Sequence, residues 1–136
     1  MVMKVSVAPI NSLLFLSDVD GGRPPTPVWG ATILSTPSCI SFICFPEQDG
    51  QTELSMGARQ EIDWGIKPNF EGDLETPHRV IVVSTVDEQT VMKMIVPTTR
   101  THVCIWLSHP RWPERVAIGL GKPRGLPVGA ITPSNR

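Results

Sequence analysis

Apolar and polar residues alternate in short runs along the chain, and most runs are bounded by Pro, Gly, Asp or Asn. Alternation with a period of two is typical of β-strands that bury one face. The runs predict nine strands, at residues 3–7, 12–17, 28–34, 38–45, 51–56, 79–85, 90–96, 100–107 and 114–119. Many short strands separated by turn residues favour a sandwich or a barrel.

The clearest strand is residues 38–45. Ile40, Phe42 and Cys44 share one face of this strand, and Ile43 adds apolar area to the other. Apolar side chains on both faces indicate a strand with neighbours on both sides.

Two turns predict how the strands pair. Asp49-Gly50 predicts a hairpin between strands 38–45 and 51–56, because Asp-Gly tolerates the positive φ angles of a tight turn. A second hairpin is expected between 79–85 and 90–96. Strand 100–107 follows closely and would complete a three-stranded meander.

Residues 57–78 show no sustained period of two or 3.6, so we expect a long surface loop there. Loops of this length are uncommon in small domains unless they carry function. The loop contains the residues that we take as candidates for partner binding: Asp63, Trp64, Glu71, Asp73 and Glu75.

Composition supports one small domain. The 136 residues are 40% hydrophobic and 18% charged, which is enough apolar surface for one core. The 14 prolines and 11 glycines disfavour long helices. The predicted fold class is an all-β, antiparallel two-sheet β-sandwich of about eight or nine short strands with one long acidic loop. It would span residues 1–120, and the Gly/Pro-rich residues 121–136 are expected to form a flexible or oligomer-docking tail.

Three cysteines, Cys39, Cys44 and Cys104, lie among apolar residues at spacings that match no disulfide scaffold. We expect buried free thiols and a cytoplasmic protein. No apolar run approaches the roughly 20 residues that span a bilayer, so no membrane association is expected.

Charge is unevenly distributed, although the formal net charge is only −1. Residues 47–88 contain ten acidic and three basic side chains, whereas residues 93–136 contain seven basic side chains and one acidic side chain. The acidic segment indicates a surface for a basic partner, unless its charges are simply solvated.

Residues suited to catalysis or metal binding match no known motif. His102 and Cys104 are two residues apart on a predicted strand, so they share a face with Trp106, and these three could line a ligand pocket. Neither a nucleophile motif nor a metal-binding spacing is present, and no cofactor is expected. The chain also lacks the basic, aromatic-rich pattern of a nucleic-acid binder, which makes a nucleic-acid partner unlikely on sequence grounds.

The order of strands resembles the competence protein J-like nuclease-inhibitor and immunity-type β-sandwich family. The matching segments are Phe15-Leu16-Ser17-Asp18, Trp29 ahead of Ile40-Ser41-Phe42, the Asp49-Gly50 turn, Arg79-Val80-Ile81-Val82-Val83 leading to Val96-Pro97, and Val103-Cys104-Ile105-Trp106. After that proline the chain has Thr98-Thr99-Arg100-Thr101-His102, where the family would have a Gly and a Tyr or Phe. The resemblance implies a non-enzymatic protein that binds and blocks a partner such as a nuclease.

Three functions remain open on sequence alone. The first is a non-enzymatic binding domain whose acidic loop holds a basic protein. The second is a small-ligand-binding or hydrolytic domain with a pocket near His102, Cys104 and Trp106. The third is an oligomeric structural protein, such as a homodimer joined through its tail or strand edges.

Overall fold

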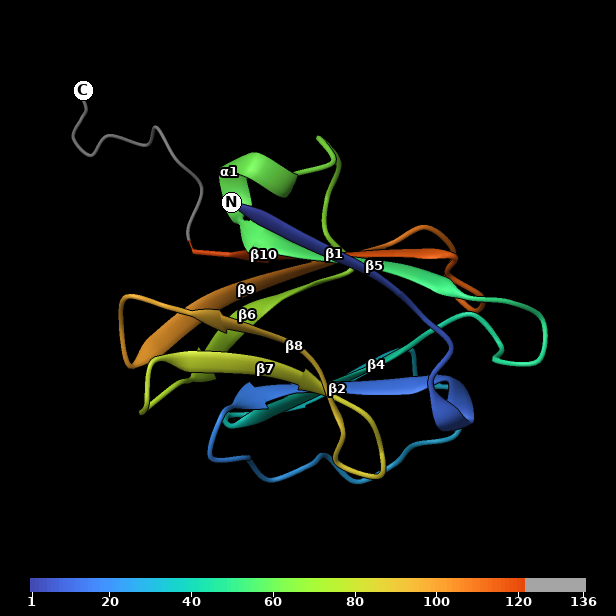
Figure 1. The fold of residues 1–136 in the computed structure, drawn as a ribbon, viewed down its shortest axis with the longest axis horizontal. Helices are drawn as coiled ribbons and strands as arrows, with labels where there is room; N and C mark the ends of the chain where they lie inside the picture. The colour runs from blue at the N-terminus through green and yellow to red at the C-terminus, as the bar shows by residue number, and fades with distance from the viewer. Residues whose placement is uncertain (122–136) are drawn as a thin grey trace.

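Two five-stranded sheets pack face to face in the computed structural model, which describes residues 1–121 (Figure 1). Sheet A contains, in spatial order, β1 (Val2–Val7), β5 (Thr52–Ala58), β10 (Arg115–Leu120), β9 (Arg100–Leu107) and β6 (Phe70–Glu75). Sheet B contains β3 (Ile33–Thr36), β4 (Cys39–Ile43), β2 (Leu13–Asp18), β7 (Val80–Ser84) and β8 (Thr90–Ile95). The predicted all-β sandwich is confirmed.

Two short helices accompany the strands. The 3-10 helix η1 (Ile10–Ser12) links the first strands of the two sheets. The four-residue helix α1 (Arg59–Ile62) directly follows β5 and lies on the outer side of sheet A (Figure 1). No helix within residues 1–121 is long and apolar enough to cross a membrane.

The main core lies between the sheets and consists of the inward-facing residues of both. Ile40 and Phe42 of β4 are fully buried, as are Leu54 and Met56 of β5. Alternate residues on these strands enter the core because successive side chains of a strand point to opposite faces. Interior strand β4 also buries Cys39 and Ser41 on its outer face, which agrees with the two-sided pattern in the sequence.

Every predicted strand overlaps an observed one, but two predicted strand pairings are wrong. Strands β4 and β5 do not form a hairpin across Asp49-Gly50, because β5 lies in sheet A between β1 and β10. The β7–β8 hairpin is confirmed, whereas β9 leaves the expected meander and pairs with β6 and β10. In both cases the turn reverses the chain, but the next strand joins the opposite sheet.

The segment 57–78 is not a continuous loop. It contains α1 and the edge strand β6, which pairs antiparallel with β9. The alternation of β6 is weak in the sequence because only Leu74 is fully buried, Phe70 is half-buried and Gly72 interrupts the pattern.

The strand predicted at residues 28–34 is shorter than expected. Residues 28–32 are not in a strand, and β3 begins only at Ile33. The predicted tail, residues 121–136, lies outside the described residues except for Gly121.

Candidate functional site

Two sets of candidate residues that are distant in sequence, the acidic residues of segment 57–78 and the pocket residues of strand 100–107, meet on the outer face of sheet A. In the β6–β9 ladder, Glu71 lies opposite Cys104 and Asp73 lies opposite His102. Glu75 lies opposite Arg100 one pair further along. Directly opposite residues of two antiparallel strands project from the same face. The predicted acidic segment and the predicted pocket are therefore one site.

A small apolar cluster forms the floor of this site beneath α1. It contains Ile62, Cys104, Trp106 and Ala117, with Trp64 packed against it. Trp106 is fully buried and its Nε1 donates a hydrogen bond to the Ile66 carbonyl at 2.8 Å. Trp64 is half-buried, 6.4 Å from Trp106 between ring centroids. The two tryptophans thus fix α1 and the following loop to the sheet.

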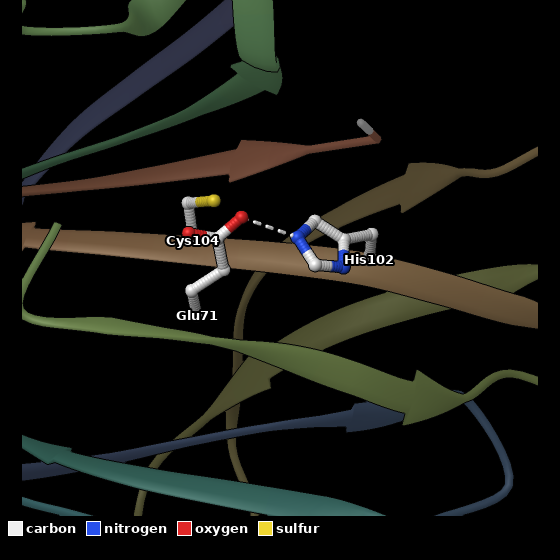
Figure 2. Close-up of side chains that lie close together, drawn as sticks. All are labelled: Glu71, His102 and Cys104. Atoms are coloured by element: carbon white, nitrogen blue, oxygen red, sulfur yellow. Dashed lines mark hydrogen bonds and ion pairs between the residues drawn. The ribbon is translucent and has the colours of Figure 1, made fainter. Parts of the chain in front are cut away.

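A network of charged groups lies beside the apolar cluster. His102 places Nδ1 at 2.9 Å from Asp73 Oδ1 and Nε2 at 2.7 Å from Glu71 Oε2. Figure 2 shows the Glu71 carboxylate between the His102 ring and the Cys104 sulfur. Because both ring nitrogens face carboxylates, the doubly protonated imidazolium is the form that satisfies both contacts.

Arg59 completes the network from the first turn of α1. Its Nη1 donates to Glu71 Oε2 at 3.0 Å and lies 2.8 Å from Cys104 Sγ, and its Nε contacts Asp63 Oδ2 at 3.4 Å. The Arg59 side chain is only 12% exposed, whereas those of Glu71 and Asp63 are 43% and 36% exposed. The guanidinium therefore neutralises part of the acidic charge from the inner side of the site.

These contacts shift the pKa values of the site in consistent directions. Burial alone would lower the pKa of His102, but hydrogen bonds to Glu71 and Asp73 raise it overall. Hydrogen bonds from His102 and Arg59 lower the pKa of Glu71. Burial raises the pKa of the Cys104 thiol to about 11. The network favours a charged His102–Glu71 pair beside a protonated thiol.

The sequence-predicted residues differ in what they offer to a partner. Glu71, Asp73 and Glu75 are exposed on β6, and Asp63 is exposed just after α1, where its Oδ1 accepts a hydrogen bond from the Gly65 amide at 2.7 Å. Trp64, the fifth member of the predicted set, is half-buried under the Arg115 guanidinium, which lies 5.1 Å from its ring centroid.

The three residues of the predicted ligand pocket differ in burial and position. Cys104 and Trp106 are fully buried. A hollow of about 650 Å³ lies next to His102, between the start of α1 and the segment that links β8 to β9, and neither Cys104 nor Trp106 lines it. Asp73, Arg100 and Ile95 also line it.

Two features of the site were missed from the sequence. Arg59 was not a candidate, although its spacing of four residues from Asp63 is the separation that permits ion pairs on a helix. The spacing along the chain also matched no metal motif. In the fold, however, potential ligand atoms of Glu71, His102 and Cys104 lie within 4.8 Å of one another.

Comparison with known proteins shows similarity in structure but not in sequence. No protein-family model matches the chain, and no curated protein matches it significantly. ComJ from Bacillus subtilis, described as an inhibitor of the DNA-degrading activity of NucA, aligns with a TM-score of 0.65 at 9% identity, over 90% of this chain and 99% of ComJ. The product of crocagin biosynthetic gene J aligns with a TM-score of 0.50 at 10% identity, over 91% of this chain and 98% of that protein. The chain therefore has the fold of ComJ, and the resemblance that its strand order predicted is confirmed at the level of architecture.

Proposed function

We propose that the chain is a non-enzymatic, inhibitor-type binding domain that holds a basic protein, such as a nuclease, against the outer face of sheet A. The contact would be made by Asp63, Glu71, Asp73 and Glu75, which we call the acidic face, with Trp64 supporting it from below. The observation that carries the proposal is the exposure of three carboxylates along one side of the edge strand β6.

Neighbouring cations compensate part of the charge of the acidic face. Its four carboxylates lie beside the guanidinium groups of Arg59 and Arg100, and Arg115 covers Trp64. The exposed carboxylates of β6, rather than a large net charge, would therefore contact a basic partner. Glu75 and Arg100 lie opposite each other in the β6–β9 ladder. The ion pairs found in the described part of the chain do not include one between these two side chains. Complementary charge across an interface raises the association rate and selects the partner.

The likeness to ComJ supports an inhibitor role for this fold. ComJ is an inhibitor of a DNA-degrading activity. Proteins that hold DNA use Lys and Arg to contact phosphate, so a surface that blocks such a protein benefits from carboxylates that replace the phosphates. The acidic face has this chemistry.

Edge-strand protection is the alternative explanation of the same charges. Charged side chains on an edge strand prevent edge-to-edge pairing between molecules. In that case, removal of the charges would promote self-association and leave partner binding unchanged. The two explanations therefore predict different results in one experiment.

The test is a pull-down from bacterial lysate at low and moderate salt, with the untagged chain immobilised through its surface amines. The variant carries Asp63→Asn, Asp73→Asn and Glu75→Gln. Glu71 is kept because it bonds to both Arg59 and His102. A matched control carries Asp20→Asn, Asp49→Asn and Glu88→Gln, which remove the same charge from exposed positions elsewhere.

We expect wild type and the control to retain a basic protein whose DNA-degrading activity is blocked by added chain. Retention should weaken with salt because exposed charges are screened. The acidic-face variant should no longer retain this basic protein. Equal retention by the variant, or no basic protein in any eluate, would refute the proposal.

A further inference from the structure

The geometry points to a transition-metal site at Glu71, His102 and Cys104, and we propose that this site binds Zn²⁺ in exchange for the guanidinium of Arg59. The inference is independent of the partner-binding proposal, because it concerns a ligand of the isolated chain. Three observations carry it: the donor set, the orientation of His102 and the position of Arg59.

The donor set is one that zinc prefers. A carboxylate oxygen, an imidazole nitrogen and a thiol sulfur converge within 4.8 Å (Figure 2). Zinc binds all three ligand types in tetrahedral sites, whereas Mg²⁺ and Ca²⁺ bind oxygen almost exclusively. The sulfur and nitrogen therefore select a borderline metal, and three protein ligands leave the fourth position to water.

The distances require only small movements. Zinc–ligand bonds of about 2.0–2.3 Å place tetrahedral ligand atoms about 3.3–3.8 Å apart. The most widely separated pair in the cluster, at no more than 4.8 Å, would have to close by about 1 Å. The Glu71 side chain, which is 43% exposed, has the freedom to make most of this adjustment.

His102 is already held in the orientation of a metal ligand. Asp73 accepts from Nδ1 at 2.9 Å, which directs Nε2 toward Glu71 and the centre of the cluster. Metal-binding histidines nearly always have such a carboxylate or carbonyl on the second ring nitrogen. Asp73 would thus act as a positioning residue that fixes the ring.

Arg59 shows that the cluster attracts a cation. Its Nη1 lies 3.0 Å from Glu71 Oε2 and 2.8 Å from Cys104 Sγ, so the guanidinium contacts two of the three proposed ligands. A zinc ion and this guanidinium cannot occupy the cluster together. Arg59 already contacts the exposed Asp63 and can pair with it when displaced. Zinc binding would release the thiol proton and the Nε2 proton to solvent.

Cobalt and zinc titrations of the reduced, untagged full chain test the site. Co²⁺ bound to a thiolate in a tetrahedral site gives a near-ultraviolet charge-transfer band and visible bands, and added Zn²⁺ should abolish both. We expect these bands in wild type, and about tenfold or greater zinc affinity in Arg59→Gln, because a competing positive charge is removed. Asp73→Asn should weaken zinc binding about 10- to 100-fold.

Ligand variants separate this cluster from other thiols. Cys104→Ser should lose the charge-transfer band, and Cys39→Ser, which changes a buried thiol in sheet B, should keep it. Should Cys104→Ser fail to fold, His102→Gln keeps the sulfur and should still lose tight binding. The inference is wrong if neither wild type nor Arg59→Gln gives a thiolate–cobalt band. It is equally wrong if the band persists in folded Cys104→Ser or if His102→Gln binds as wild type does.

Discussion

Asp18 is a buried carboxylate whose hydrogen bonds join distant parts of the chain. Asp18 is the last residue of β2, and its side chain is only 2% exposed. Its Oδ1 accepts a hydrogen bond from the His78 amide, which is 60 residues away in sequence, at 2.9 Å. Its Oδ2 accepts from the Asp20 amide at 3.0 Å and lies 2.7 Å from His78 Nδ1. Burial favours the neutral acid, but these hydrogen bonds outweigh it and lower the pKa of Asp18.

Replacing Asp18 by Asn should destabilise the fold by about 1–3 kcal/mol, because the amide group keeps only one acceptor and turns a donor toward an N–H group. Urea unfolding measures this loss. Asp20→Asn, at an exposed neighbouring position, is the control and should change stability by less than about 0.5 kcal/mol. Equal stability of the two variants would contradict the role of Asp18.

His78 should make stability depend on pH. Its hydrogen bond and attraction to Asp18 raise its pKa above the ordinary value of 6.5. Protonated His78 therefore favours the folded state, with its full contribution below about pH 6.5 and a progressive loss as pH rises through the raised folded-state pKa.

The measurement is the free energy of unfolding in urea at about pH 5.5 and pH 8.5, for wild type and His78→Gln. The difference between the two proteins should be largest at the lower pH and shrink at the higher one. Taking this difference removes the contribution of His102, which both proteins share. A difference that does not change with pH would show that the Asp18–His78 contact is not formed in solution.

Helix α1 and strand β10 pack closely at Gly119, where even a methyl group would crowd its neighbours. A Cβ at this position would lie 3.0 Å from Trp106, 3.1 Å from Ile62 and 3.3 Å from the Arg59 Cα. Glycine at position 119 therefore allows α1, which carries Arg59, to lie close against sheet A. The element that positions the site depends on a residue that carries no functional group.

Gly119→Val should push α1 away from sheet A and reduce stability by about 1–3 kcal/mol through overpacking. Urea unfolding gives the free energy, and tryptophan fluorescence reports the change around Trp106 and Trp64. The matched control Ser6→Val adds the same side chain to an exposed position of β1 and should be nearly neutral. An unchanged fluorescence spectrum and stability in Gly119→Val would contradict this packing.

The three cysteines report on burial in different parts of the sandwich. Cys39 and Cys44 lie in and just after β4 of sheet B, and Cys104 lies in β9 of sheet A; all three are free and buried. Burial raises their pKa values to about 11, 12 and 11 respectively. Native thiols at neutral pH are therefore both covered and protonated.

A bulky aromatic disulfide reagent at about pH 8 should react slowly with the native protein, because all three thiols are buried and their raised pKa values keep them mostly protonated. In denaturing urea three thiols should react rapidly. Quantitative thiol titration, with mass spectrometry to locate the label, provides the measurement. Rapid labelling of any of the three thiols under native conditions would contradict this protection.

Local sequence patterns were sufficient for the fold class and for the approximate position of most strands. Apolar and polar residues alternate along a strand, as in Ile40-Ser41-Phe42, because successive side chains point to opposite faces of the strand. This alternation is a local property of the sequence. The charge excess of residues 47–88 and the shared face of His102 and Cys104 are also local properties. Each was visible before any pairing was known.

Tertiary structure decided which strands pair and what the site contains. Turn residues such as Asp49-Gly50 reverse the chain, but the choice of sheet depends on contacts between strands that are far apart in sequence, such as the parallel β5–β10 pair. The weak alternation of β6 became a strand only through its ladder with β9. That ladder brings Glu71 to His102 across 31 residues, and α1 brings Arg59 to Cys104 across 45. Most residues of the candidate site could therefore be identified from the sequence. That they lie next to one another is decided by the long-range register of the sheet.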